Sequence, residues 1–158
     1  MRKRIIPSTQ EEIVESTEDW LHLEHVATVE VTSEEAEHPV ESALLPNRGE
    51  GWRAATPGVQ ELRLLFDSPQ QVRRIRLHFI EAATERTQEF VLRYSIDHGK
   101  SFQEIVRQQW NFSHWGATSE VEEYRVELSG VTTLELSITP DISGGSACAS
   151  LASLRLSA

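Results

Sequence analysis

The chain has almost no cysteine, no long apolar run and too few basic residues to balance its acidic ones. Of its 158 residues, one is cysteine and 15 are lysine or arginine, against 25 aspartate or glutamate residues. A single cysteine excludes an intramolecular disulfide and, by itself, a thiolate zinc site, so we expect Cys148 to be a small buried side chain. The net charge of −10 disfavours general nucleic-acid binding, because a phosphate backbone is repelled by an acidic surface, although a local basic patch remains compatible with it.

No stretch approaches the roughly 18 apolar residues of a membrane span. The first residues, Met1-Arg2-Lys3-Arg4, resemble the basic start of a secretory signal, but Ile5-Ile6-Pro7 then gives way to polar and acidic residues. A signal peptide needs a longer apolar stretch at that place. We therefore expect a cytoplasmic protein with no membrane partner.

Residues 1–24 are polar and acidic, and they predict an N-terminal arm that forms a short helix or stays loose. Packing of Trp20 and Leu21 on the rest of the chain would be needed to order this arm. His22 and His25 would share one face of a helix and are candidate metal ligands. No third ligand accompanies them, which favours an ordinary surface role.

From Val29 onward, apolar and polar residues alternate with a period of two. Successive side chains of a β-strand point to opposite faces, so each alternating run predicts a strand with one buried and one solvated face. The predicted buried positions are Val29 and Val31; Leu62, Leu64 and Phe66; Ile75, Leu77 and Phe79; Phe90, Leu92, Tyr94 and Ile96; Phe102 and Ile105; Tyr124, Val126 and Leu128; Leu134, Leu136 and Ile138; Leu154 and Leu156.

Turn-forming residues separate these runs. They are Asp67-Ser68-Pro69, the hairpin-like Asp97-His98-Gly99-Lys100, Ser129-Gly130 and Ser143-Gly144-Gly145-Ser146. About eight short strands with no strong helix between them indicate an all-β fold, an antiparallel β-sandwich or jelly roll, over residues 25–158.

Two long connections are predicted to contain no strand, residues 37–58 and 108–120. Loops carried by a rigid sandwich usually hold the binding residues. The second connection is dense in aromatic residues, which stack on the C–H faces of sugars, and it also contains groups that hydrogen-bond hydroxyls. The predicted ligand-binding residues are Trp110, Asn111, Phe112, His114 and Trp115, with Arg53 from the first connection. The alternative is that Trp110 and Phe112 continue a strand and enter the core.

Other candidate groups favour structural roles. Asp97 and His98 form a reactive-looking pair, but Asp and Gly suit a hairpin turn at this position. Arg74, Arg76 and His78 form a stripe along one strand, which is either an anion-binding surface or a solvated strand face. The sequence contains no Gly-rich phosphate loop, nucleophile elbow or metal-ligand spacing, so we predict a protein that is not an enzyme.

The order of these segments resembles the discoidin family, also called coagulation factor 5/8 type C domains, and the bacterial sugar-binding modules of that fold. The resemblance covers most of the chain, from about Val26 to the end. It is carried by Val29–Ser33, the "ENALDG"-like Pro39–Leu44, Gly51-Trp52-Arg53, Leu62–Asp67, Val72–Leu77, the "YSxDGxxW"-like Tyr94–Phe102 and Glu123–Val126. It implies a galactose-binding-like jelly roll that binds a ligand without catalysis.

The resemblance also implies a structural calcium ion near the first loops, usually with a Glu from the last strand. Ser153 stands where that Glu is expected, and Asn47, Glu50 and loop carbonyls are the remaining oxygen candidates. We therefore predict no cofactor, with calcium as the one ion whose ligands the loops offer in part.

Three functions remain open at this point. The first is a module that binds carbohydrate or another small ligand through loops at one end of the sandwich. The second is a protein-interaction module that uses an exposed patch at Trp110 and Trp115. The third follows from Trp52-Arg53-Ala54-Ala55, which is similar to a DNA-repair scaffold domain of the same fold, although the acidic charge argues against its DNA contacts.

Overall fold

Two strands of this protein are 21 residues long, and each bends so that its two halves serve different layers of a β-sandwich. These are β3 (Gln60–Ile80) and β6 (Ser119–Thr139). The computed structural model describes residues 20–46, 50–81, 85–113 and 118–158, which form eight strands and two helices of one turn each. The other elements are α2 (Leu23–Val26), β1 (Ala27–Val31), α3 (Glu41–Leu44), β2 (Trp52–Pro57), β4 (Arg86–Ser95), β5 (Gln103–Phe112), β7 (Cys148–Leu151) and β8 (Ser153–Ser157).

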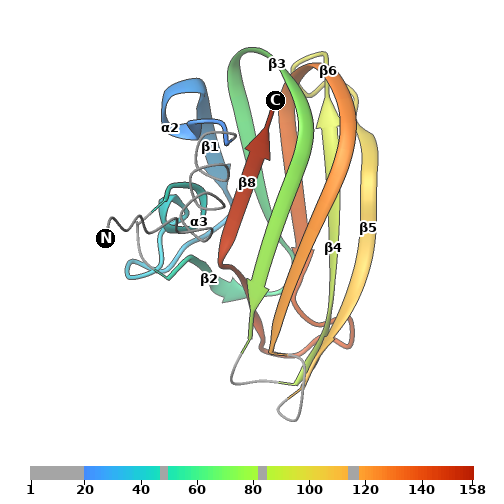
Figure 1. The fold of residues 1–158 in the computed structure, drawn as a ribbon. Helices are drawn as coiled ribbons and strands as arrows, with labels where there is room; N and C mark the ends of the chain where they lie inside the picture. Colours follow the sequence, from blue (N-terminus) through green and yellow to red (C-terminus); the bar gives the residue numbers. More distant parts are fainter. Residues whose placement is uncertain (1–19, 47–49, 82–84, 114–117) are drawn as a thin grey trace, which may run out of the picture.

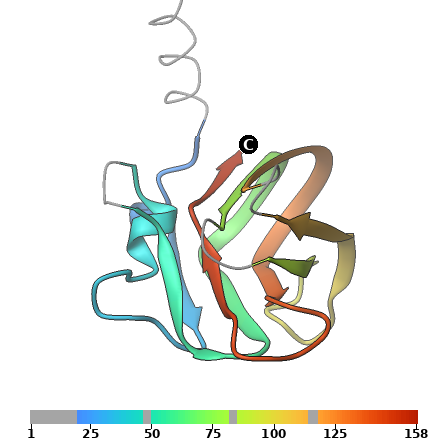
Figure 2. The ribbon, with the colours of Figure 1, turned by 90° about the horizontal axis from the view of Figure 1, so that it is seen from below.

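All strand pairs are antiparallel, and they form two packed layers with a small additional pair (Figures 1 and 2). The five-stranded layer has the order β1, first half of β3, second half of β6, β4, β5. The three-stranded layer has the order β8, second half of β3, first half of β6. β2 pairs with β7 beside these layers. The predicted antiparallel β-sandwich is therefore confirmed.

The core lies between the two layers and is filled by the predicted inward residues. Ile75 and Leu77 of one layer and Phe90 of the other have no exposed surface, and the rings of Phe79 and Phe90 lie 5.1 Å apart. Burying each such side chain contributes about 1.5–3 kcal/mol, so the two-residue alternation itself holds the layers together. Among the helices of the described ranges, none is long and apolar enough to cross a membrane.

Several sequence predictions need correction. The turn residues near Ser68 and Gly130 do not end strands but mark bends within β3 and β6. The pairing register shifts between Leu65 and Gln70, on either side of Ser68, and Gly130 has a φ of +69°. The connection 37–58 contains α3 and β2, and the connection 108–120 contains the end of β5 and the start of β6. Ile96 is 60% exposed because the hairpin begins there, and Cys148 is half-buried at the start of β7.

The predicted arm, residues 1–24, lies largely outside the described residues. Its last part contacts the three-stranded layer, because the Leu21 N–H donates to Leu156 O at 2.7 Å and Trp20 bridges to Ser157. His22 and His25 lie at α2 with their rings 6.2 Å apart.

Candidate functional site

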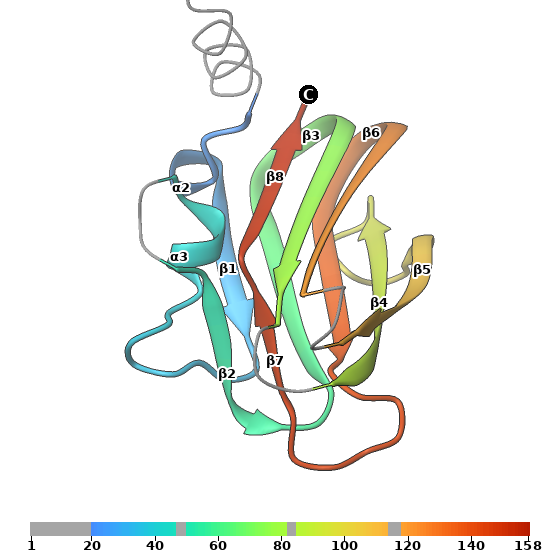
Figure 3. The same ribbon diagram turned by 60° about the horizontal axis from the view of Figure 1, so that its bottom comes forward.

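The described ends of β3, β5 and β6 lie at one end of the sandwich, called the loop end here (Figures 1 and 3). The Glu81 N–H, after β3, donates to Thr118 O at 2.8 Å, before β6. The Ile142 N–H, after β6, donates to Thr87 O of β4 at 2.9 Å. The first bond joins the residue after β3 to the residue before β6, and the second ties the connection after β6 to β4.

A buried ion pair lies under the loop end. Arg86 Nε donates to Glu81 Oε1 at 2.9 Å, and both side chains are almost fully buried. The same guanidinium donates to Gln88 Oε1 at 3.0 Å and to Pro140 O, and it lies 5.0 Å from the centre of the Phe112 ring. One arginine thus ties the chain after β3 and after β6 to the last residue of β5.

A cavity of about 440 Å³ opens beside these loops, next to the β2–β7 pair. Residue Arg53 of β2 lies opposite Ser150 of β7 in the register. The cavity is lined by His38, Glu50, Gly51, Trp52, Arg53, Ile80, Ser150, Leu151 and Ala152.

Backbone contacts hold Arg53 at this cavity. The Arg53 N–H donates to His38 O at 3.2 Å, and Arg53 O accepts from the Glu35 N–H at 2.9 Å. The indole of the preceding Trp52 is buried and donates to Ser33 O at 2.9 Å. Since Trp52 points into the core, strand alternation directs Arg53 to the opposite side.

The cavity combines a cation, a carboxylate, an imidazole and a hydroxyl with an apolar wall. Ile80 supplies that wall and is 46% exposed. Among the residues that the structure describes, the Arg53 guanidinium has no ion-pair partner, and His38 Nδ1 is buried without a hydrogen-bond partner. A few convergent polar groups beside apolar surface are the chemistry that a polyhydroxylated small molecule needs.

The predicted aromatic stretch divides between strand and loop. Phe112 is 2% exposed, Trp110 is half-buried and packs against the core, and Asn111 points outward, where its Oδ1 accepts from Thr87 Oγ1 at 2.5 Å. The strand alternative is thus what the structure shows for Trp110 and Phe112. His114 and Trp115 lie outside the described residues.

Of the predicted residues that the structure describes, Arg53 alone lines the cavity. Sequence reasoning did not assign His38, Ile80 or Ser150 to the site, and it gave Glu50 only as a candidate calcium ligand. His38 and Glu50 do fall in the first long connection, residues 37–58, and Ile80 directly follows the run of Ile75, Leu77 and Phe79 on its outward side. These residues become neighbours only through the β2–β7 pair, which the alternation did not reveal.

The described residues show no cluster of carboxylates of the kind that a structural calcium ion prefers. Calcium takes six to eight oxygen ligands, with several carboxylates. In the described ranges, no three His, Cys, Asp or Glu side chains gather at one point, and Ser153 lies on β8 opposite His78. Asn47 lies outside the described residues.

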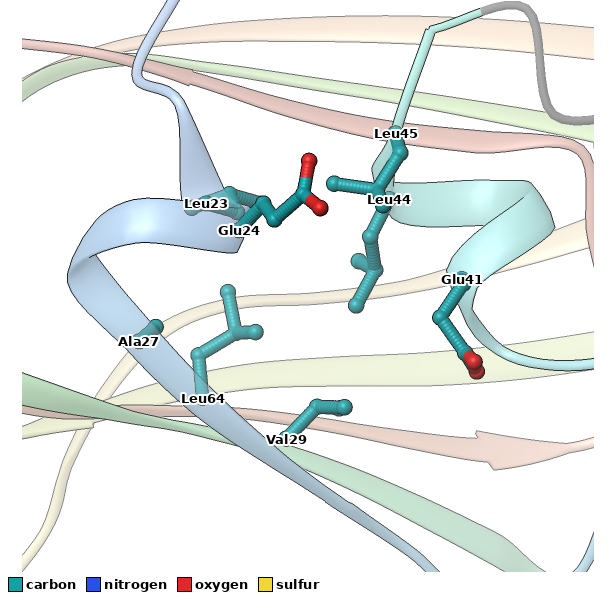
Figure 4. A pocket seen from close by; sticks show the side chains of 8 residues that line it. All are labelled: Leu23, Glu24, Ala27, Val29, Glu41, Leu44, Leu45 and Leu64. Carbon is teal, nitrogen blue, oxygen red and sulfur yellow. The ribbon is translucent and has the colours of Figure 1, made fainter.

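A second cavity, of about 310 Å³, lies between α2, α3, β1 and β3 (Figure 4). Leu23, Val29, Leu44 and Leu64 line it, and the Glu24 carboxylate extends from α2 toward α3. Apart from the carboxylates of Glu24 and Glu41, the side chains of its lining are apolar, and none of them is a cation or a hydroxyl.

Asp97 and His98 occupy the predicted hairpin turn. Asp97 Oδ1 accepts from the Ser101 N–H at 2.9 Å, and His98 has a φ of +60°. Hydrogen bonds from Ser101 and then Ser95 hold the pKa of the Asp97 carboxyl well below its ordinary value. This pair therefore closes a turn, as the composition predicts.

Comparison with known proteins extends over most of the chain. The family model described as F5/8 type C domain matches residues 28–153. Among curated proteins, no sequence matches this chain.

Solved structures share the fold at low sequence identity. A family 32 carbohydrate-binding module (CBM) from C. perfringens NanJ, solved with galactose, is 14% identical, covers 87% of this chain and 97% of its own, and has a TM-score of 0.64. A pectin-binding module is 17% identical over 85% and 91%, with a TM-score of 0.61. The family 32 module of AlyQ, solved with 4,5-unsaturated mannuronic acid, is 15% identical over 83% and 94%, with a TM-score of 0.60.

Proposed function

Because the chain belongs to the F5/8 type C domain family, we propose that it is a non-catalytic carbohydrate-binding module whose ligand binds in the loop-end cavity. The observation that carries this proposal is the convergence of Arg53, Glu50, His38 and Ser150 beside the exposed face of Ile80. Neighbours of the same fold were solved with galactose or an unsaturated uronic acid, which supports a sugar as the class of ligand.

The proposed chemistry follows from the donors and acceptors of the cavity. A guanidinium donates two parallel hydrogen bonds to neighbouring hydroxyls or to a carboxylate, and a carboxylate accepts from two hydroxyls. Arg53 and Glu50 would thus recognise adjacent oxygen atoms on one edge of a sugar ring, while Ile80 packs against its C–H groups.

The same lining argues against glycoside hydrolysis. Most glycosidases use two carboxyl groups that flank the scissile bond. Among the described residues of the cavity, Glu50 is the one carboxylate. The cavity is therefore suited to bind a sugar rather than cleave it.

The protein-interaction alternative loses part of its support. It requires an exposed aromatic patch at Trp110 and Trp115, but Trp110 packs against the core. No described contact favours that alternative over a sugar ligand.

The test is a glycan array that contains neutral and uronic-acid glycans, followed by calorimetry of the strongest glycan. Arg53→Ala should weaken binding at least about tenfold, because it removes charge-assisted hydrogen bonds. Arg107→Ala is the matched control, since Arg107 is an exposed arginine of β5 that pairs with Glu89 and Glu104, away from the cavity. A wild-type chain that binds no glycan, or two variants with equal affinity, would refute the proposal.

A further inference from the structure

The outward face of the three-stranded layer is basic, although the whole chain carries a net charge of −10. In Figure 1 its strands β8, β3 and β6 lie side by side. The inward positions of these strands are core residues such as Ile75, Leu77 and Leu156, so the residues between them point outward. Five arginines share this outward side and form what we call the arginine face: Arg73, Arg74, Arg76, Arg125 and Arg155.

Strand register places these arginines next to one another. Arg76 lies opposite Arg155 on β8, and Arg74 lies opposite Arg125 on β6. A register shift between Val72 and Arg74 leaves Arg73 exposed as well, so two consecutive arginines lie at the solvent side. Like charges directly opposite each other destabilise a sheet, and Glu123, which lies opposite Arg76 and pairs with Arg74, offsets part of this repulsion.

Two of the five arginines are held by the protein itself. Arg74 pairs with Glu123 and lies 4.2 Å from the centre of the Trp20 ring. Arg155 donates to Ala43 O at 2.8 Å. Burial, and then the nearby charge of Arg76, lower the pKa of Arg155.

The other three present their charge to solvent. Arg73 and Arg125 are exposed and border a shallow hollow of about 390 Å³ together with Val126 and Glu127. Arg76 is half-buried, it lies between Arg155 and Glu123 in the strand register, and no ion pair among the described residues engages it. These planar groups match carboxylate oxygens in bidentate geometry.

The arginine face leads to the loop-end cavity. β3 continues from Arg76 through His78 to Ile80, which lines that cavity. At about 3.3 Å per residue, Arg76 lies roughly 13 Å from Ile80. A polymer with one unit in the cavity would therefore pass over the arginines.

We propose that the arginine face binds the carboxylate groups of an acidic polysaccharide. The choice of a polysaccharide among polyanions rests on the proposed function, because the face adjoins the proposed sugar site. Hydroxyl side chains also lie along the face and toward the cavity, with Ser157 opposite Arg74, Ser153 opposite His78 and Ser119 opposite Ile80. On the described outward positions of these strands, His78 is the one aromatic ring that could stack on a nucleobase, and its Nε2 lies 3.0 Å from Ser119 Oγ. The acidic remainder of the chain repels a long nucleic acid duplex.

The test uses the full chain and polygalacturonate, with neutral dextran as the uncharged polymer, in affinity electrophoresis and calorimetry at about 50 mM salt. Wild type should bind polygalacturonate and not dextran, and the affinity should fall as salt increases. Arg76→Gln combined with Arg125→Gln should weaken binding at least about tenfold. Arg107→Gln is the matched control and should bind as wild type does.

Further arms separate this proposal from the loop-end site and from other polyanions. The double variant should bind the array glycan as wild type does, whereas Arg53→Ala should lose that glycan yet keep at least part of its polygalacturonate binding. A double variant that binds polygalacturonate as tightly as wild type would refute the proposal. So would tighter binding of a 20-base-pair DNA or of anionic lipid vesicles than of polygalacturonate. If the glutamine pair unfolds, Arg76→Lys with Arg125→Lys keeps the charge, and it should retain salt-sensitive binding with reduced affinity.

Discussion

At Gly51 the backbone takes a φ of +99°, and a methyl group there would meet Leu151 O at 2.5 Å. This close approach lets β7 lie against the start of β2, where the cavity forms. We expect Gly51→Ala to destabilise the fold by at least about 1–3 kcal/mol, because it adds a clash to an unfavourable backbone conformation. Urea unfolding measures the loss.

Gly58 is the matched control for this substitution. It has a similar φ of +89°, but a methyl group there would have no neighbour within 4 Å. Gly58→Ala should therefore cost about 1 kcal/mol, which is the backbone contribution alone. Equal losses at the two glycines would contradict the role of the close approach.

Glu120 is a buried carboxyl group, 3% exposed, between the two layers. Burial, and then the neighbouring Glu122, raise its pKa from 4.5 to about 8. Both of its oxygens lack a hydrogen-bond donor among the described residues, so the protonated form is the stable one in the fold. The native state thus binds more protons than the unfolded state between these two pKa values.

The free energy of unfolding should accordingly fall as the pH rises from about 5 to 9, because the folded state must lose the proton that it holds at Glu120. Below pH 4.5 both states are protonated at this group, and the stabilising contribution is complete. Glu120→Gln keeps the shape without a charge, so it should flatten the slope and stabilise the chain at pH 9. Thermal melting across this range gives the comparison, with Glu127→Gln as an exposed control on the same strand. The same slope in both variants would contradict the assignment to Glu120.

At the scale of the strands, the sequence predicts the inward faces better than the strand ends. Alternation identified Leu62 through Phe79 and Leu134 through Ile138 correctly, because burial on one face imposes the period. The alternation predicted two strands in place of each of β3 and β6. A bend within a strand and the end of a strand interrupt the alternation in the same way, here at Pro69 and Gly130. It also missed β7, whose small buried residues show no alternation.

The candidate site was predictable only in part for a related reason. Arg53 was selected because it ends a long connection with turn-forming residues. His38 and Glu50 fall in the predicted connection 37–58, but their proximity to Ser150 depends on the pairing of β2 with β7, which the sequence does not reveal. The Trp110–Phe112 segment was predicted as a loop, although its side chains already alternate like those of β5.

Three neighbouring strands are linked by one buried carboxylate on the outer side of the five-stranded layer. Glu135 of β6 is 1% exposed and accepts from Arg63 Nε of β3 at 2.7 Å and from Arg93 of β4. Burial alone would raise the pKa of Glu135, but hydrogen bonds from Arg93 and then Arg63 outweigh it and lower that pKa. The ionised Glu135 therefore stabilises the folded state at a pH above the pKa that this carboxyl has in the unfolded chain. That stabilisation is lost as the pH falls through its lower pKa in the folded state.

Glu135→Gln should destabilise the chain by about 1–3 kcal/mol at pH 7, because each charged hydrogen bond is weakened. The loss should shrink in acid, where wild type also loses its charge at this position. Glu104→Gln, in an exposed ion pair with Arg107, is the control and should change stability by less than about 1 kcal/mol. A pH-independent difference between wild type and Glu135→Gln would contradict the ion-pair role.

Across the whole molecule, charge is separated between surfaces. The arginine face concentrates positive charge on a chain whose total is −10, so the rest of the surface is strongly acidic. Such a distribution orients an approaching polyanion toward one layer and repels it elsewhere, more strongly at low salt. The loop-end cavity lies at the edge of this favourable field.

Whole-molecule stability should not depend on calcium. The Arg86–Glu81 ion pair lies under the loop end, and the described residues hold no cluster of three His, Cys, Asp or Glu side chains. A ligand that binds only the folded state raises its stability, so removing a bound ion would lower the melting temperature. We expect the melting temperature in excess EDTA to stay within about 1 °C of that in millimolar calcium, since a shift of that size corresponds to less than about 0.5 kcal/mol. A larger fall in EDTA, restored by calcium but not by magnesium, would show that oxygen ligands of the loops do bind the ion.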